Sequence, residues 1–337
     1  MSKSNSNLPS TIFRRATFDE ELLTMQRWRH LWGDGLSPSC LVERESILRS
    51  HESWGRNVEV YCIADTITNE LYSTCDVYTI PAILNGVNVE FLHVASLFTP
   101  EEHRKKGFAS ALIGGLIRIG ERKSGVIGII LFSDIGASFY NSLGFKVVGD
   151  EDIPHDFVFP AVDLLSFETS TIPVELIKDV EELEEVYSNK VEYDVSDNNT
   201  AILPIEISRA KFHIHFDSFC PKAQKLDSKK TIFSAAKSGT DVIMFTADYN
   251  KNELEILAMS ASNGDVAISL IGAAMKEAVS RGLDCVRLWS NKGNSCYKEK
   301  FKDFKGERVE RKGRLPMMYQ FSSDLEGLSN ISRIHWW

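Results

Sequence analysis

The sequence predicts an α/β protein of the α+β type, in which helices flank a mixed, mostly antiparallel sheet and a second, degenerate copy of the unit follows. Three observations predict it. Apolar runs at residues 58–64, 71–80 and 87–97 are joined by short polar turns, which is typical of an antiparallel meander. The last of these runs, a helical segment and another apolar run at 126–132 predict two parallel strands joined by a helix. A similar pattern recurs in the second half.

The size and charge of the chain narrow its class. Its 337 residues, 43% of them hydrophobic, can bury a substantial core and favour two domains, which we place at residues 11–165 and 166–337 after a disordered tail at 1–10. The net charge of -9 argues against nucleic acid as a partner and is compatible with a cationic substrate. No apolar run reaches the roughly 20 residues needed to cross a membrane.

The cysteines carry no metal-binding or disulfide pattern. They are scattered without C-x-x-C spacing, in a chain that begins with no apolar segment: Cys40, Cys62, Cys75, Cys220, Cys285 and Cys296. This predicts free thiols in a reducing compartment and no zinc module. We therefore expect a cytoplasmic protein, with entry into the nucleus left open.

The remaining elements of the first half follow from local signals. A strand at residues 12–16 precedes a helix that Thr17 or Asp19 is expected to cap, and a second helix follows Ser39. Beyond the run at 126–132, Asp134 is expected to begin a short helix that ends at residue 144, before a strand at 145–148.

The second half begins with an acidic helix predicted at residues 175–187 and then repeats the first half. Residues 269–273 echo residues 111–115, and residues 286–291 lie where residues 129–134 would fall. Tyr297 lies seven residues after Ser290, as Tyr140 lies seven after Ser133. We interpret this as a degenerate internal repeat; two unrelated helices of similar composition are the alternative.

A basic turn with one glycine precedes the first of the repeated helices and reads Arg104-Lys105-Lys106-Gly107-Phe108-Ala109. The N–H groups at a helix N-terminus can bind phosphate, and a glycine lets the phosphate approach the backbone closely. The corresponding residues 262–267 contain Asp265 and no arginine or lysine. Because a carboxylate repels phosphate, the sequence predicts that only the first half binds a phosphate-bearing cofactor.

In this context the turn resembles that of the GNAT superfamily of acyl-CoA-dependent N-acyltransferases, whose Q/R-x-x-G-x-G/A motif is matched by Arg104, Gly107 and Ala109. Residues 99–101 are similar to the family's lead-in, with one extra residue before the arginine, and residues 139–145 are similar to its tyrosine helix and Gly-Phe pair. The resemblance implies a GNAT-like first domain, a degenerate GNAT-like second domain, and acetyl-CoA as co-substrate without a metal. It implies cofactor binding by Leu97, Phe98, Thr99, Arg104, Lys105, Lys106, Gly107, Phe108, Ala109 and Ser110.

A narrower resemblance covers the whole chain. Residues 314–317 (Arg-Leu-Pro-Met) and 333–337 (Arg-Ile-His-Trp-Trp) are similar to segments of the fungal L-lysine N6-acetyltransferase group. This implies an enzyme that transfers acetyl from acetyl-CoA to the side-chain amine of free L-lysine in lysine degradation. The alternatives are a protein or histone-tail N-acetyltransferase and a non-catalytic acyl-CoA-binding sensor.

Acyl transfer to an amine needs a proton acceptor, because a lysine ammonium has a pKa of about 10.4. Glu90, a carboxylate in an otherwise apolar strand, is the expected base, and a solvent-facing glutamate is the alternative. His93 is expected to be packed rather than catalytic. Tyr140 matches the family's tyrosine acid, which would protonate the departing thiolate; a packed aromatic side chain is the alternative.

The acceptor site is the least specified part of the sequence. A lysine α-carboxylate needs cationic or amide donors, and Arg314, Arg333 and His335 are candidates if the second half folds over the first. His213 and His215 lack a third ligand at metal-binding spacing, so we expect structural histidines and no metal. The sequence leaves the oligomeric state open.

Overall fold

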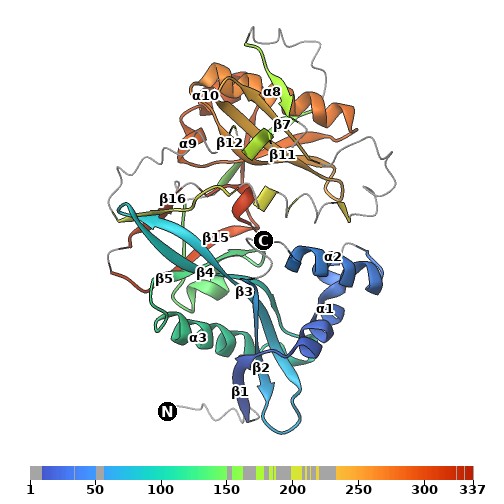
Figure 1. Ribbon diagram of the computed structural model, residues 1–337, viewed down its shortest axis with the longest axis vertical. Helices are drawn as coiled ribbons and strands as arrows, with labels where there is room; N and C mark the ends of the chain where they lie inside the picture. Colours follow the sequence, from blue (N-terminus) through green and yellow to red (C-terminus); the bar gives the residue numbers. More distant parts are fainter. Residues whose placement is uncertain are drawn as a thin grey trace.

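The structure is a computed structural model that describes residues 10–33, 35–50, 57–149, 154–161, 172–177, 182–184, 186, 199–206, 209–210, 213, 218–219, 233–323, 325–329 and 331–336. The predicted tail up to residue 9, together with His215, Cys220 and Trp337, lies outside these residues. Two sheets with their helices are stacked along the long axis of the molecule (Figure 1). No helix among the described residues is long and apolar enough to cross a membrane.

The first sheet contains the predicted meander and the predicted parallel pair. Its central order is β1-β2-β3-β4-β5-β15-β6, and β9 and β16 lie off this path. Neighbours along the order are antiparallel except β4 and β5, which are parallel. The strands are β1 (Thr11–Arg15), β2 (Glu59–Asp65), β3 (Leu71–Leu84), β4 (Val87–Phe98), β5 (Val126–Ser133), β6 (Lys146–Val147), β9 (Thr200–Ile202), β15 (Leu315–Gln320) and β16 (Gly327–Ser329).

The helices of the first half follow the predicted signals. Thr17 caps α1 in a reciprocal capping box with Glu20. Helix α3 connects β4 to β5 and buries a fully apolar face against the sheet, with Leu112, Ile113 and Leu116 inaccessible to solvent. The helical segments are α1 (Phe18–Trp32), α2 (Pro38–Ser50), the 3-10 turn η2 (Glu101–His103), α3 (Phe108–Gly120) and α4 (Ser138–Asn141).

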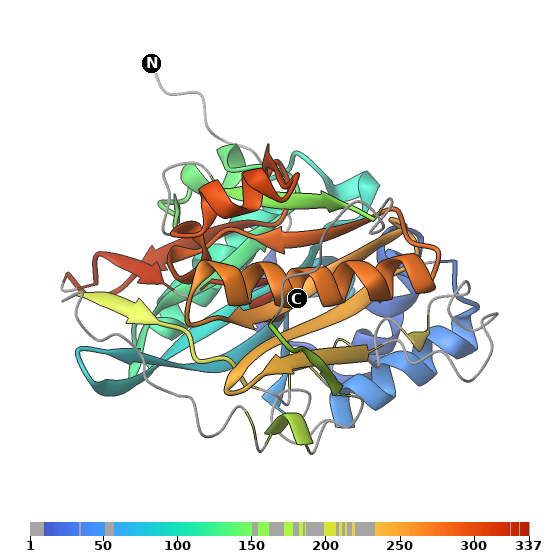
Figure 2. The same ribbon diagram turned by 90° about the horizontal axis from the view of Figure 1, so that it is seen from above.

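The second sheet repeats this arrangement. Its order is β14-β7-β13-β12-β11-β10-β8, and β12 and β13 are the parallel pair, connected by α8, which lies across the sheet (Figure 2). The predicted repeat is thus confirmed at the level of topology. Its elements are β7 (His155–Pro160), β8 (Glu175–Ile177), β10 (Phe233–Ser238), β11 (Asp241–Asp248), β12 (Glu253–Ser260), α8 (Gly264–Ser280), β13 (Cys285–Trp289), α9 (Lys292–Ser295), α10 (Lys298–Asp303), β14 (Glu307–Glu310) and the 3-10 turn η4 (Arg333–His335).

The acidic helix predicted at residues 175–187 is wrong at its beginning. Glu175–Ile177 is the strand β8, and among the described residues of this segment only 182–184 and 186 are helical. Strand β8 pairs with β10, with Ile177 opposite Ala235, and Ile177 is fully buried. Burial of this side chain in the sheet overrides the helical preference of the acidic residues around it.

Each sheet contains at least one strand from the other half of the chain. Strand β7, which precedes the predicted boundary, belongs to the second sheet, and β15 from the second half lies between β5 and β6 of the first sheet (Figure 1). The boundary itself, at residues 165 and 166, lies outside the described residues and stays a prediction. The pairing of β15 with β5 fixes the C-terminal part of the chain directly beside β5.

Candidate active site

The two parallel strands of the first sheet separate at their carboxyl ends. Strands β4 and β5 pair from Glu90 opposite Val126 up to Val94 opposite Leu131, although β4 continues to Phe98. Ser96 adopts a left-handed backbone with φ of 51°, at a register shift between β3 and β4. Such a bulge bends a strand and interrupts its ladder. The side of residues 95–98 that would face β5 therefore has no strand partner among the described residues.

A pocket lies at this separation. Its volume is about 890 Å³, including the part open to solvent. It lies between the two strands, the first two helices, the segment after β5 and the C-terminal segment. The lining residues are Trp28, Trp32, Arg44, Glu45, Val94, Ala95, Ser96, Leu97, Leu131, Phe132, Asp134, Ile135, Tyr140 and Trp336. Of the residues predicted to bind the cofactor, only Leu97 lines this pocket.

The basic turn lies at the N-terminus of α3, as predicted. Gly107 is the N-cap with φ of 86°, and no side chain caps the helix. Lys105 also has a left-handed backbone, with φ of 61°, and the side chain of Arg104 turns back to donate to the Thr99 carbonyl at 3.1 Å. The turn exposes Lys105 and Lys106. The first N–H groups of α3 are therefore free of side-chain caps, which is the condition for binding an anion.

Tyr140, which the sequence predicts to be the acid, is one of the residues that line the pocket. It lies on α4 and is 6% exposed, with its ring packed against Phe139 and Phe145 at centroid distances of 4.9 and 5.7 Å. Its hydroxyl makes no hydrogen bond within the part of the chain that the structure describes. Burial raises the pKa of Tyr140 well above its ordinary value, so the phenol stays protonated.

Glu90 and His93, on the same strand, do not reach this position. Glu90 lies six residues before Ser96, about 20 Å along an extended strand, and does not line the pocket. His93 is inaccessible to solvent and packs against Tyr78 and Phe132, and burial lowers its pKa to about 3. Strand β4, which carries the predicted base, does line the pocket, but it does so around the bulge at Ser96, far from Glu90.

Two other carboxylates line the pocket. Glu45 is 6% exposed and accepts from the Arg44 guanidinium at 3.1 and 3.0 Å, and burial raises its pKa. Asp134 directly follows β5, and its Oδ1 accepts from the Arg314 backbone N–H at 3.1 Å. Although solvent reaches Asp134, the surrounding protein raises its pKa. Its place after a buried parallel strand was the available signal, because ligands bind at the carboxyl ends of such strands.

The three residues predicted to bind the acceptor lie near the pocket without lining it. Arg314 and Arg333 both donate to Glu255, which is 1% exposed. His335 is inaccessible; it donates to the Pro204 carbonyl and accepts from the Ser332 N–H, each at 3.1 Å. Burial lowers the pKa of His335 to about 3. The C-terminal segment does reach the pocket, but through Trp336.

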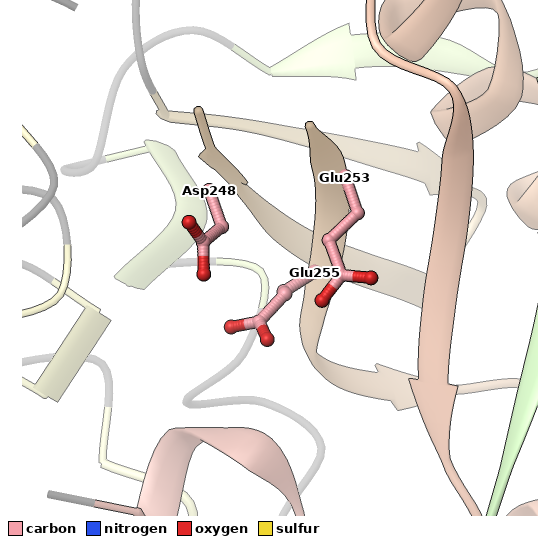
Figure 3. A group of neighbouring side chains, drawn as sticks. All are labelled: Asp248, Glu253 and Glu255. Carbon is pink, nitrogen blue, oxygen red and sulfur yellow. The ribbon is translucent and has the colours of Figure 1, made fainter. Parts of the chain in front are cut away.

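A cluster of three carboxylates lies in the second half, where Asp248, Glu253 and Glu255 point toward one another within 4.8 Å (Figure 3). Lys251 lies 2.9 Å from Asp248, and Arg287 donates to Glu253 at 2.9 Å. Together with the two arginines on Glu255, these cations neutralise the carboxylates. Charge pairing therefore accounts for the cluster without a metal ion.

His213 is also a structural residue. It is 1% exposed, its Nε2 donates to the Ile334 carbonyl at 3.1 Å, and burial lowers its pKa well below the ordinary value. A neutral histidine that anchors the C-terminal segment agrees with the structural role expected from the sequence.

Comparison with known proteins identifies the fold. No protein-family model matches the chain, and no curated protein matches it significantly in sequence. A GCN5-related N-acetyltransferase from Kribbella flavida is similar with a TM-score of 0.60 and 15% identity, over 94% of this chain and 72% of that one. One from Anabaena variabilis has a TM-score of 0.60 and 13% identity, over 93% and 73%.

A third similar structure has two such units. It is a tandem GNAT protein from the clavulanic acid biosynthesis pathway, with a TM-score of 0.53 and 12% identity, over 93% of this chain and 99% of that one. The chain therefore has the fold of the GCN5-related N-acetyltransferases, in a two-unit arrangement.

Proposed function

We propose that the protein is an acyl-CoA-dependent N-acetyltransferase that acts on a small-molecule amine. The observation that carries this proposal is the separation of β4 from β5 at residues 95–98, which opens into a pocket containing Tyr140 and two carboxylates. A thioester inserted at the separation could bond to backbone groups that the ladder leaves unpaired, and its carbonyl would lie beside the pocket.

The donor would be held at two places. The uncapped N–H groups of α3 and the backbone of residues 104–110 would bind the pyrophosphate, while the lysine side chains add positive charge. The N–H groups of Leu97 and Phe98 would receive the oxyanion of the tetrahedral intermediate. The exposed turn and the strand separation then form the two ends of one cofactor site.

Two proton transfers complete the reaction. We assign the proton acceptor to Asp134 in place of Glu90, because Asp134 lines the pocket and its raised pKa makes it a better base than an ordinary aspartate. The neutral amine attacks the thioester carbonyl, and collapse of the intermediate breaks the carbon–sulfur bond. Tyr140, protonated at neutral pH, would donate to the sulfur.

The proposed acceptor is free L-lysine, consistent with a role in lysine degradation. Its ammonium groups would form ion pairs with Asp134 and Glu45. Its α-carboxylate would form an ion pair with Arg44, the basic residue among those that line the pocket. Arg44 takes the role that the sequence suggested for Arg314, Arg333 and His335. The indoles of Trp28 and Trp32 would cover the aliphatic chain.

Release of free thiol from acetyl-CoA tests the proposal. The acceptors are free lysine, free ornithine, lysine methyl ester and a histone-tail peptide, and the site of acetylation is read by mass spectrometry. We expect the fastest turnover with free lysine, on the side-chain nitrogen. Preference for the peptide would favour a protein acetyltransferase. Binding of acetyl-CoA without thiol release for any amine would favour a sensor.

A further inference from the structure

The C-terminal segment supplies one wall of the pocket. Trp336 is half-buried and lines the pocket, whereas residues 331–335 just before it are buried. Strand β15, from the same part of the chain, lies directly beside β5. The pocket of the first sheet is therefore completed by the second half of the chain.

The segment that carries Trp336 is anchored in the second half. Ile334 is inaccessible to solvent in the core around β10 and β11, and its carbonyl accepts from His213. His335 is held by Pro204 and Ser332. Because backbone and side chains of η4 are bound in this way, the indole of the next residue has a defined position.

Two guanidinium groups lie over the indole. The Cζ atoms of Arg333 and Arg314 lie 4.1 and 4.4 Å from the centroid of the Trp336 ring. Both arginines donate to the same buried carboxylate, Glu255, and the backbone N–H of Arg314 donates to Asp134. Glu255, in the second half, thus binds both of the arginines that lie over the Trp336 indole. One of these arginines, Arg314, also contacts the assigned base through its backbone.

We propose that Trp336 determines acceptor specificity and that Glu255 is a positioning residue, which acts through Arg314 and Arg333. This inference rests on the proposed function. With Trp28 and Trp32 of α1, Trp336 gives the pocket three indoles beside two carboxylates. Such a surface can bind an alkyl chain that ends in an ammonium group, through apolar contact with the indoles and charge attraction to the carboxylates. The second half therefore selects alkylamine acceptors for a reaction catalysed in the first.

The test uses the full-length chain and compares Trp336→Ala with Trp336→Phe. Because an indole packed against the alkyl chain of the acceptor contributes apolar contact, we expect Trp336→Ala to raise the acceptor KM about tenfold and to leave the acetyl-CoA KM unchanged. Trp336→Phe keeps an aromatic wall and should recover most of the loss. An unchanged acceptor KM in Trp336→Ala, with wild-type melting temperature, would overturn the proposal.

Glu255 is tested against a neighbour in the same cluster. Glu255→Gln removes the charge shared by Arg314 and Arg333 and should raise the acceptor KM in the same direction as Trp336→Ala. Glu253→Gln is the matched control, because Glu253 is similarly buried and binds Arg287 instead. Equal acceptor KM values for these two variants, at equal melting temperature, would contradict the positioning role.

Calorimetric titration of lysine into the CoA-loaded protein separates this inference from the proposed function. If the wild-type protein binds lysine but transfers no acetyl group, the proposed function fails, and the weaker binding expected for Trp336→Ala still supports the role of Trp336. If the wild-type protein binds no alkylamine, the inference fails as well.

Discussion

The N-termini of α3 and α8 occupy the same place in two copies of one topology, yet they differ in how their N–H groups are used. At α3 the N-cap is Gly107, which has no side chain to offer. At α8 the N-cap is Asn263, whose Oδ1 accepts from the N–H groups of Asp265 and Val266, both at 3.0 Å. The donors that a phosphate would need are open in the first copy and occupied in the second.

The tyrosines of the two copies differ in the same sense. Tyr140 lines the pocket and its hydroxyl makes no hydrogen bond within the described residues, whereas the Tyr297 hydroxyl donates to the Ala261 carbonyl at 2.7 Å, next to the end of β12. Lys300 forms an ion pair with Asp265 at 2.8 Å and so covers the N-terminus of α8 further. The comparison teaches that a shared fold keeps its strands and helix while the local hydrogen bonds differ, and we expect these hydrogen bonds to determine which copy can bind a cofactor.

The largest expected difference between the copies is at the tyrosines. Tyr140→Phe should lower kcat by about 10²-fold or more, because the leaving thiolate loses its acid. Tyr297→Phe should leave kcat unchanged and cost about 1 kcal/mol of stability, the net value of one hydrogen bond. Steady-state kinetics and thermal melting measure both effects. Equal kcat values for the two variants would remove the catalytic assignment of Tyr140.

The assigned base gives the next largest effect. Asp134→Asn should lower kcat by about 10²-fold. A base must be ionised, so wild-type activity should fall as the pH drops through the pKa of Asp134, which lies above its ordinary value. That acidic limb should be absent from the residual activity of Asp134→Asn. Glu90→Gln is the control, with kcat expected near wild type; a large loss there would restore Glu90 as the base.

Giving the N-terminus of α3 the carboxylate found at the N-terminus of α8 should weaken cofactor binding. Ala109 is the second residue of α3 and Asp265 the second residue of α8. Ala109→Asp places a carboxylate among the N–H groups proposed to bind the pyrophosphate and should weaken acetyl-CoA binding about tenfold, by repulsion and competition. Asp265→Ala, the matched change in the other copy, should leave the affinity unchanged.

The smallest effect concerns the cap that closes the second copy. Asn263→Ala removes a side chain that satisfies two N–H groups of α8 and should cost about 1 kcal/mol of stability. Acetyl-CoA binding and kcat should not change. Chemical denaturation gives the first quantity, and a loss of acetyl-CoA affinity would show that the second copy takes part in cofactor binding.

The sequence predicted the features that depend on neighbours along the chain. The strand periodicity of the meander, the cap at Thr17 and the glycine turn before α3 are local signals, and the structure contains each of them. The insertion of β15 beside β5 has no local signal, because it pairs residues that are 182 to 192 positions apart in the sequence. The same holds for β8, where burial of Ile177 overrode an acidic, helix-favouring segment.

The pocket was predicted in part for the same reason. Leu97 precedes the segment 99–101 and Tyr140 lies within the segment 139–145, both of which resemble family motifs, and both residues line the pocket. Glu45 and Trp336 also line it but come from distant elements. The position of Glu90 could not be judged from alternation alone, since the left-handed Ser96 and its register shift with β3 determine where β4 leaves β5. Long-range pairing decides which carboxylate reaches the pocket.

The stoichiometry of acetyl-CoA binding, measured by calorimetric titration, tests the central claim most directly. Because the N-terminus of α3 is uncapped and that of α8 is capped, we predict that one acetyl-CoA molecule binds per chain. We expect Ala109→Asp to weaken this binding and Asp265→Ala to leave it unaffected. Two molecules per chain, or one molecule whose affinity responds to Asp265→Ala and not to Ala109→Asp, would contradict the assignment of the cofactor to the first half.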